Sequence, residues 1–168
     1  NQKGIARLSE AYADASLDVL IIVGDDQEEI YQNDSRPAIA VYWGDTFVNG
    51  QVQITPDMSE ARRSSAWGWR EPDGEKSFAV AKDLSLHVIE DLNDNEFDVA
   101  HINRMPEHNS QMGHAFGFVY RRIMQDKVIP TIPVMVNTYY PPNQPTLSRC
   151  YRLGKQIRQA VESWPADI

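Results

Sequence analysis

A short apolar run near the start of the chain, followed at once by polar residues, constrains the fold more than any other feature. The run Leu17–Val23 is rich in β-branched side chains, and it is too short to cross a membrane. A strand that is apolar on both faces is typical of a parallel sheet covered by helices. Gly24, Asp25, Asp26 and Gln27 follow directly, so we expect them at the carboxyl end of this strand, the edge at which open α/β sheets bind ligands.

Further apolar runs alternate with helical patterns along the chain. The segments that we expect to share one sheet with Leu17–Val23 are residues 38–43, 97–102 and 132–136. Helices are predicted over residues 5–15, 56–64, 78–92, 115–124 and 147–164. A hairpin is expected at 47–54, and a loop rich in Trp, Gly and Pro at 67–74. The alternation predicts an α/β fold, a single domain in which helices flank a mostly parallel central sheet.

Charge and composition exclude several classes of protein. The 168 residues carry 24 acidic side chains against 16 Lys and Arg, which gives a formal net charge of −8. Binding to nucleic-acid phosphates needs clustered Lys and Arg, so we expect no nucleic-acid partner. No segment is long and apolar enough to span a membrane, so we expect no membrane partner either. Cys150 is the single cysteine, which rules out a disulfide within these residues and fits a cytoplasmic protein.

Two histidines follow predicted strands and are candidates for acid–base chemistry. His108 lies in a polar loop after the strand at 97–102, where it is either an acid–base group or an ordinary surface residue. His114 lies at a predicted helix start, where the helix dipole disfavours its proton and should lower its pKa. The alternative for His114 is a capping or buried structural role.

Carboxylates and tyrosines supply further candidates. The acidic residues between Asp25 and Glu29 can bind a hard metal ion, act as bases or begin a helix, and these roles are compatible. Tyr139 and Tyr140 follow another buried run in a Pro-rich segment. They can form the wall of a pocket for an aromatic ring, or simply a stiff connection. No zinc-protease, phosphate-loop, dinucleotide or nucleophile-elbow motif is present.

Three segments, in this order and spacing, resemble the class III extradiol ring-cleavage dioxygenases of the protocatechuate 4,5-dioxygenase type. They are residues 17–27, 96–108 and 137–154. The similarity is greatest to the branch that cleaves gallate and 3-O-methylgallate, and it extends over nearly the whole chain. The resemblance implies that residues 1–168 are the central part of one catalytic domain, excerpted from a longer protein.

The resemblance also implies an enzyme that opens a catechol-like or gallate-like ring with O2. Family members hold Fe(II) with two His and one Glu, and the resemblance places one His before Asn1 and the Glu after Ile168. The second His position is occupied here by Gln27, whose amide oxygen is a weaker iron ligand. His108 matches an additional active-site His of the family, whereas His114 has no counterpart that can be carried over.

These considerations define the expected site. We expect His108 and His114 to be catalytic, Tyr139 and Tyr140 to bind the substrate, and Gln27 to belong to the metal site. We also expect Gln27 and His108 to face one cleft.

The departure at Gln27 leaves other hypotheses open. One is a non-catalytic homologue or partner subunit with a degraded metal site, and another is a metal-independent binding module on the same scaffold. The partners that we expect are an aromatic small molecule, O2, and either further copies of the chain or a related subunit.

Overall fold

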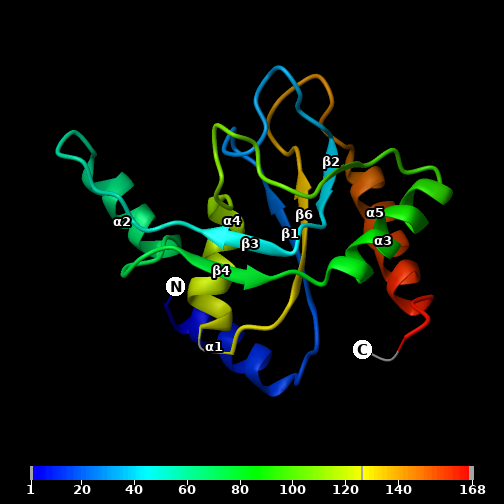
Figure 1. Ribbon diagram of the computed structural model, residues 1–168, viewed down its shortest axis with the longest axis horizontal. Coiled ribbons are helices and arrows are strands. Elements are labelled where there is room, and N and C mark those ends of the chain that lie inside the picture. Colours follow the sequence, from blue (N-terminus) through cyan, green and yellow to red (C-terminus); the bar gives the residue numbers. More distant parts are fainter. Residues whose placement is uncertain (1, 126, 167–168) are drawn as a thin grey trace.

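A four-stranded sheet lies at the centre of the protein (Figure 1). The computed structural model describes residues 2–125 and 127–166. In spatial order the strands are β1 (Leu20–Asp25), β6 (Thr131–Val136), β2 (Ile39–Tyr42) and β5 (Ala100–Ile102). Each of the four predicted buried runs contributes one strand, so the prediction of a shared sheet is confirmed.

The direction of the strands changes once across this sheet. β1 pairs in parallel with β6, and β2 pairs in parallel with β5, whereas β2 and β6 are antiparallel. The predicted α/β class with a mostly parallel sheet is therefore confirmed. The single antiparallel pairing places the carboxyl ends of β1 and β6 at one edge of the sheet and those of β2 and β5 at the opposite edge.

Helices cover both faces of the sheet. Their bounds are α1 (Gln2–Asp14), α2 (Glu60–Trp69), α3 (Lys82–Asp94), α4 (His114–Phe118), the π-helix η1 (Val119–Met124) and α5 (Leu147–Glu162). Ser59 and Thr146 cap α2 and α5 by accepting backbone N–H hydrogen bonds. None of the described helices is long and apolar enough to cross a membrane.

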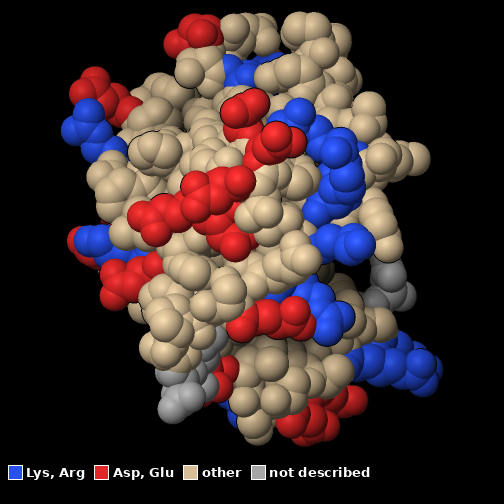
Figure 2. Space-filling model, turned by 90° about the vertical axis from the view of Figure 1, so that its right-hand side faces the viewer, with Lys and Arg blue, Asp and Glu red and all other residues tan. Residues whose placement is uncertain are grey.

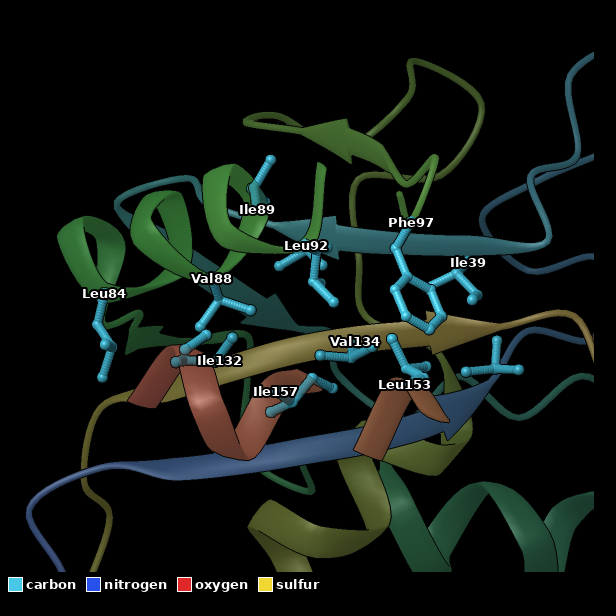
Figure 3. Close-up of a cluster of buried hydrophobic side chains, with 13 residues drawn as sticks. Ile39, Leu84, Val88, Ile89, Leu92, Phe97, Ile132, Val134, Leu153 and Ile157 are labelled. Carbon is cyan, nitrogen blue, oxygen red and sulfur yellow. The ribbon is translucent and has the colours of Figure 1, made fainter. Parts of the chain in front are cut away.

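The larger core fills the space between the sheet, α3 and α5 (Figure 3). Leu92 from α3, Val134 from β6 and Leu153 from α5 meet there and are almost completely buried. A second cluster, which includes Phe116 and Met135, fills the opposite face beneath α4 and η1. Because β6 contributes to both clusters, it is buried on both faces, as its apolar sequence predicts.

The outer surface of the α3 and α5 layer carries charges of both signs. Figure 2 shows acidic side chains near the centre of this face and basic side chains mainly toward one side of it. The basic residues of α5 are Arg149, Arg152, Lys155 and Arg158. This face therefore presents no continuous basic surface.

The predicted hairpin at 47–54 is wrong. Strand β3 (Thr46–Asn49) pairs instead with the distant β4 (Lys76–Ala79) in a separate two-stranded sheet. The Asn49 side chain is buried and donates to the backbone carbonyl of Trp69 and to Glu71. The chain then continues along the segment at Glu71, where Gln51 forms a parallel bridge.

Two helix boundaries also differ from the prediction. Phe78 belongs to β4, where its ring stacks on Tyr120, and α3 begins only at Lys82. Helix α2 begins at Glu60 after the Ser59 cap and continues to Trp69. The loop predicted at 67–74 is therefore helical in its first part.

Candidate functional site

A polar cluster lies at the carboxyl end of β1, where Asp25, Gln27 and Glu29 meet His114 at the start of α4. The Nδ1–H of His114 donates to Oε2 of Glu29 at 2.7 Å, and its backbone N–H lies 3.1 Å from both carboxylate oxygens. On its other side, Nε2 lies 3.8 Å from Oδ1 of Asp25. The imidazole therefore lies between two carboxylates.

Two glycines allow this close approach. A Cβ atom at Gly24 would lie 2.9 Å from Cβ of Ala115 and 3.1 Å from the Phe116 ring, so α4 can approach β1 only because residue 24 has no side chain. A Cβ at Gly113 would lie 2.6 Å from Oε2 of Glu29. Glycine at these positions brings His114 to both carboxylates.

The carboxylates set the proton affinity of the histidine. The hydrogen bond that His114 donates to Glu29 raises the pKa of His114 above its usual value. Burial partly opposes this effect, and the charges of Glu29, Asp25 and Asp26 add to it. The expectation that the helix dipole would lower this pKa is wrong, because a carboxylate in direct contact outweighs the partial charge of a five-residue helix.

Asp26 has a structural role in the same turn. Its side chain is buried, and its two oxygens accept the backbone N–H groups of Ile30 and Tyr31 at 2.8 and 2.9 Å. Burial raises the pKa of Asp26, although these hydrogen bonds act in the opposite direction. These hydrogen bonds fix the turn from Asp26 to Tyr31. The turn places Gln27 beside Asp25 and Glu29 beside His114.

Gln27 is exposed and anchored by Asp25. Its Nε2 donates to Oδ2 of Asp25 at 2.9 Å. A carboxylate only accepts hydrogen bonds, so the amide nitrogen must face it, and the amide oxygen is the atom left for a ligand.

Tyr139 reaches the same edge of the sheet from the end of β6. Asp25 and Tyr139 line a cavity of about 490 Å³ beside α5, together with Gly24 and Cys150. Tyr140 faces a different neighbour, since the guanidinium of Arg36 lies 3.8 Å from the centre of its ring. Gln27 and His114 each contact Asp25 directly. Tyr139 only shares a cavity with Asp25, and neither Gln27 nor His114 lines that cavity.

His108 lies beyond Trp69 from this cluster. It lines one cavity of about 460 Å³ with Trp69 and another of about 360 Å³, and Gln27 is among the lining residues of neither. The strand directions explain this separation, because the segment that carries His108 leaves the opposite edge of the sheet. It returns toward the cluster at Asn109, whose Nδ2 donates to the Glu29 carbonyl at 2.6 Å.

The described residues do not by themselves fit an iron centre. Among residues 2–125 and 127–166, no group of three or more His, Cys, Asp and Glu is arranged to hold a metal ion. In the polar cluster, Nδ1 of His114 is already bound to Glu29, and Gln27 supplies only an amide oxygen. The arrangement is suited to holding and moving a proton.

Sequence reasoning did not identify three features of this region. In the sequence Glu29 is one member of an acidic run, and nothing there indicates its pairing with His114, which lies 85 residues away. Trp69, whose ring packs edge-on to His114 at 6.2 Å, ends α2, whereas the sequence predicts a loop at this position. The adjacent Arg70 stacks over Trp69 at 4.0 Å. The Gly113-His114 pair was the available signal, because a glycine beside a functional residue often permits a close contact.

Comparison with known proteins places the chain in a family. The family model described as "Catalytic LigB subunit of aromatic ring-opening dioxygenase" matches residues 1–168. A gallate dioxygenase from Pseudomonas putida (strain KT2440) is 30% identical over 88 residues, which is 51% of this chain and 24% of that relative. The match thus covers about a quarter of the relative's length. The chain belongs to the family of catalytic LigB subunits of aromatic ring-opening dioxygenases.

Proposed function

We propose that the protein opens the ring of a catechol-like or gallate-like compound with O2 at an extradiol position. The observation that carries this proposal is the pairing of His114 with Glu29 beside Asp25, at a sheet edge of a chain from the ring-opening family. This is the acid–base group that ring opening requires, because the substrate hydroxyls must lose protons and the opened product must regain one.

His114 is the proton carrier of the proposed site. Glu29 holds Nδ1–H and thereby fixes the orientation of the ring. The raised pKa of His114 keeps the imidazolium present to a higher pH than for an ordinary histidine. In that form Nε2 carries the proton that can be delivered to the substrate, and Asp25 stabilises the positive charge from 3.8 Å.

Tyr139 provides the proposed contact with the aromatic ring. Its side chain is 59% exposed and lines the 490 Å³ cavity, which is large enough for one substituted ring. Tyr140, whose ring centroid lies 6.2 Å from that of Tyr139, is the proposed second aromatic contact. His108 is proposed as a catalytic hydrogen-bonding group that approaches the substrate from the side of Trp69.

Iron(II) is the proposed cofactor, and Gln27 is its proposed contact in this chain. When bound, the ion would lower the pKa of the substrate hydroxyls and bring dioxygen next to the ring. The contribution of the described residues is to orient the substrate and to move protons. The family membership and the free amide oxygen of Gln27 support this assignment.

Histidine variants test the proposal. Turnover, measured as oxygen uptake with gallate, 3-O-methylgallate and protocatechuate under iron(II), should fall about a hundredfold to ten-thousandfold in His114→Ala and in His108→Ala. His101→Ala is the matched control, because His101 is exposed on β5 and bonds only Trp43 among the described residues. Normal turnover in His114→Ala would contradict the proposed role of His114 as the proton carrier.

The second candidate is a non-catalytic homologue or partner subunit. Gln27 favours it, since the family resemblance expects a histidine ligand at this position. Gln27→His separates the candidates through bound iron measured by metal analysis. If a lost ligand is the defect, the variant gains iron and oxygen uptake, whereas in a working site the variant leaves both unchanged or lower.

The proposed assembly is a homo-oligomer, or a pairing with a related subunit, in the cytoplasm. The single cysteine and the family's catalytic-subunit description support this setting. Light scattering after size-exclusion chromatography measures the assembly directly, and a monomeric mass would contradict it.

A further inference from the structure

A cavity of about 660 Å³ lies away from the candidate site, between α1, β4 and η1. None of Asp25, Gln27, Glu29, His114 or Tyr139 lines it. Its walls combine basic side chains with an aromatic floor, and this combination indicates a ligand.

The charge of the cavity opposes that of the protein. Among its described lining residues, Lys76, Arg121 and Arg122 are basic and Glu71 is acidic, so three positive charges face one negative charge. The protein as a whole carries −8. A positive cavity within an acidic protein attracts anions and disfavours cations.

Glu71 holds two of these cations in place. It is 1% exposed, and its Oε1 accepts a hydrogen bond from Asn49. Oε2 lies 3.2 Å from Nζ of Lys76 and 3.8 Å from Nη1 of Arg121, but neither contact has hydrogen-bond geometry. One buried carboxylate thus attracts two cations without using their N–H groups, which remain available to an anion.

The floor of the cavity is aromatic. The rings of Phe78 and Tyr120 stack at 4.3 Å with an interplanar angle of 20°. Tyr120 shares a 2.6 Å hydrogen bond with Thr131, which turns its hydroxyl toward the core. The aliphatic side chain of Ile5 completes an apolar surface on which a flat or aliphatic group can pack.

The wall formed by α1 is held to η1 by side-chain hydrogen bonds. Ser9 donates to the Ile123 carbonyl at 2.8 Å, Tyr12 donates to the Lys127 carbonyl, and Gln125 donates to Ser9. Arg121 and Arg122 both belong to η1, so the basic and apolar walls have a fixed spacing. A preformed cavity of this volume is within the range of small-molecule sites.

We propose that this cavity binds an organic anion, namely a carboxylate attached to an aromatic or short aliphatic body. The carboxylate is bound by Arg122 and by the free N–H groups of Lys76 and Arg121. The apolar body packs on Phe78, which Tyr120 supports from the core side, and on Ile5. A bare inorganic anion gains only the first set of contacts, and a neutral aromatic compound gains only the second.

Benzoate is the probe that tests this proposal, with benzamide and inorganic phosphate as comparisons in isothermal titration calorimetry. Benzoate should bind saturably and at least about tenfold more tightly than either comparison, because each lacks one half of the contacts. Arg122→Gln should weaken benzoate about tenfold to a hundredfold through the loss of charge-assisted hydrogen bonds.

Two further variants make the test specific. Ala6 lies on the exposed face of α1 and lines the cavity, so Ala6→Phe should fill the space and abolish binding without disturbing the core. Lys155→Gln on α5 removes the same charge far from the cavity and should leave binding unchanged. Circular dichroism verifies the fold of each variant. Equal affinity for benzoate and benzamide overturns the proposal, and so does benzoate binding that survives both Arg122→Gln and Ala6→Phe.

Discussion

Replacing Gly113 by alanine should separate His114 from its carboxylate partner without unfolding the protein. The new Cβ would lie 2.6 Å from Oε2 of Glu29, whereas ordinary contacts begin near 3.4 Å. The carboxylate must therefore retreat by about 0.8 Å, the difference between the two distances. The same oxygen accepts from Nδ1 of His114 at 2.7 Å, so a retreat directed away from Nδ1 lengthens this contact to at most about 3.5 Å, which weakens or breaks the hydrogen bond.

The consequence for the histidine follows from the cause of its pKa shift. The hydrogen bond to Glu29 is the largest contribution that raises the pKa of His114, so this pKa should fall in Gly113→Ala. Because the clash involves the end of a flexible side chain, the backbone can stay in place and the fold should persist.

An NMR titration of the imidazole Cε1–H resonances measures this effect. Gly4→Ala is the matched control, since a Cβ at Gly4 meets no atom within 4 Å and α1 carries no residue of the polar cluster. The control should leave the pKa of His114 unchanged. A wild-type pKa of His114 in folded Gly113→Ala would refute the reasoning, because Glu29 would then not control the proton.

Three further predictions concern stability. The pKa of His114 is higher in the folded protein than the ordinary histidine value of 6.5. The stabilisation by protonated His114 should therefore be complete below about pH 6.5 and disappear as the pH rises through the folded-state pKa. Urea unfolding between about pH 6 and 9 should show this loss of stability, and the loss should be smaller in Glu29→Gln. Leu92→Ala should lower the free energy of unfolding by about 2 to 5 kcal/mol, because Leu92 is fully buried in the core of Figure 3; a loss below 1 kcal/mol in urea titrations contradicts that packing. Thr146→Ala should cost about 1 kcal/mol by removing the cap of α5, and an unchanged thermal midpoint argues against the capping bond.

The central sheet could be predicted because each of its strands lies in a short apolar run of the sequence. Residues 132–136 are apolar without alternation, and β6 is indeed buried on both faces. The direction of the strands was less accessible, since apolar runs do not distinguish parallel from antiparallel neighbours. The hairpin prediction failed at Asn49, because a turn-forming dipeptide is also compatible with a buried side chain that binds the chain elsewhere.

The site was predictable only in its local part. The sequence predicts Asp25 and Gln27 at the carboxyl end of an apolar run, and in the structure Asp25 ends β1 and Gln27 lies two residues beyond it. The contact between Glu29 and His114 depends on how α4 packs on β1 at Gly24. The pattern of apolar residues along the sequence does not predict this packing. The same packing explains why local reasoning from the helix dipole gave the wrong direction for the pKa of His114.

Oxygen consumption by the purified protein, supplied with iron(II) and gallate, 3-O-methylgallate or protocatechuate, tests the proposed function most directly. The proposal predicts uptake of one O2 for each ring opened with at least one of these compounds, and a loss of about a hundredfold or more in His114→Ala at unchanged iron content. Absence of uptake and of bound iron in the wild-type protein would contradict the proposed enzyme and leave a non-catalytic homologue. Uptake that His114→Ala leaves at the wild-type rate would contradict the site.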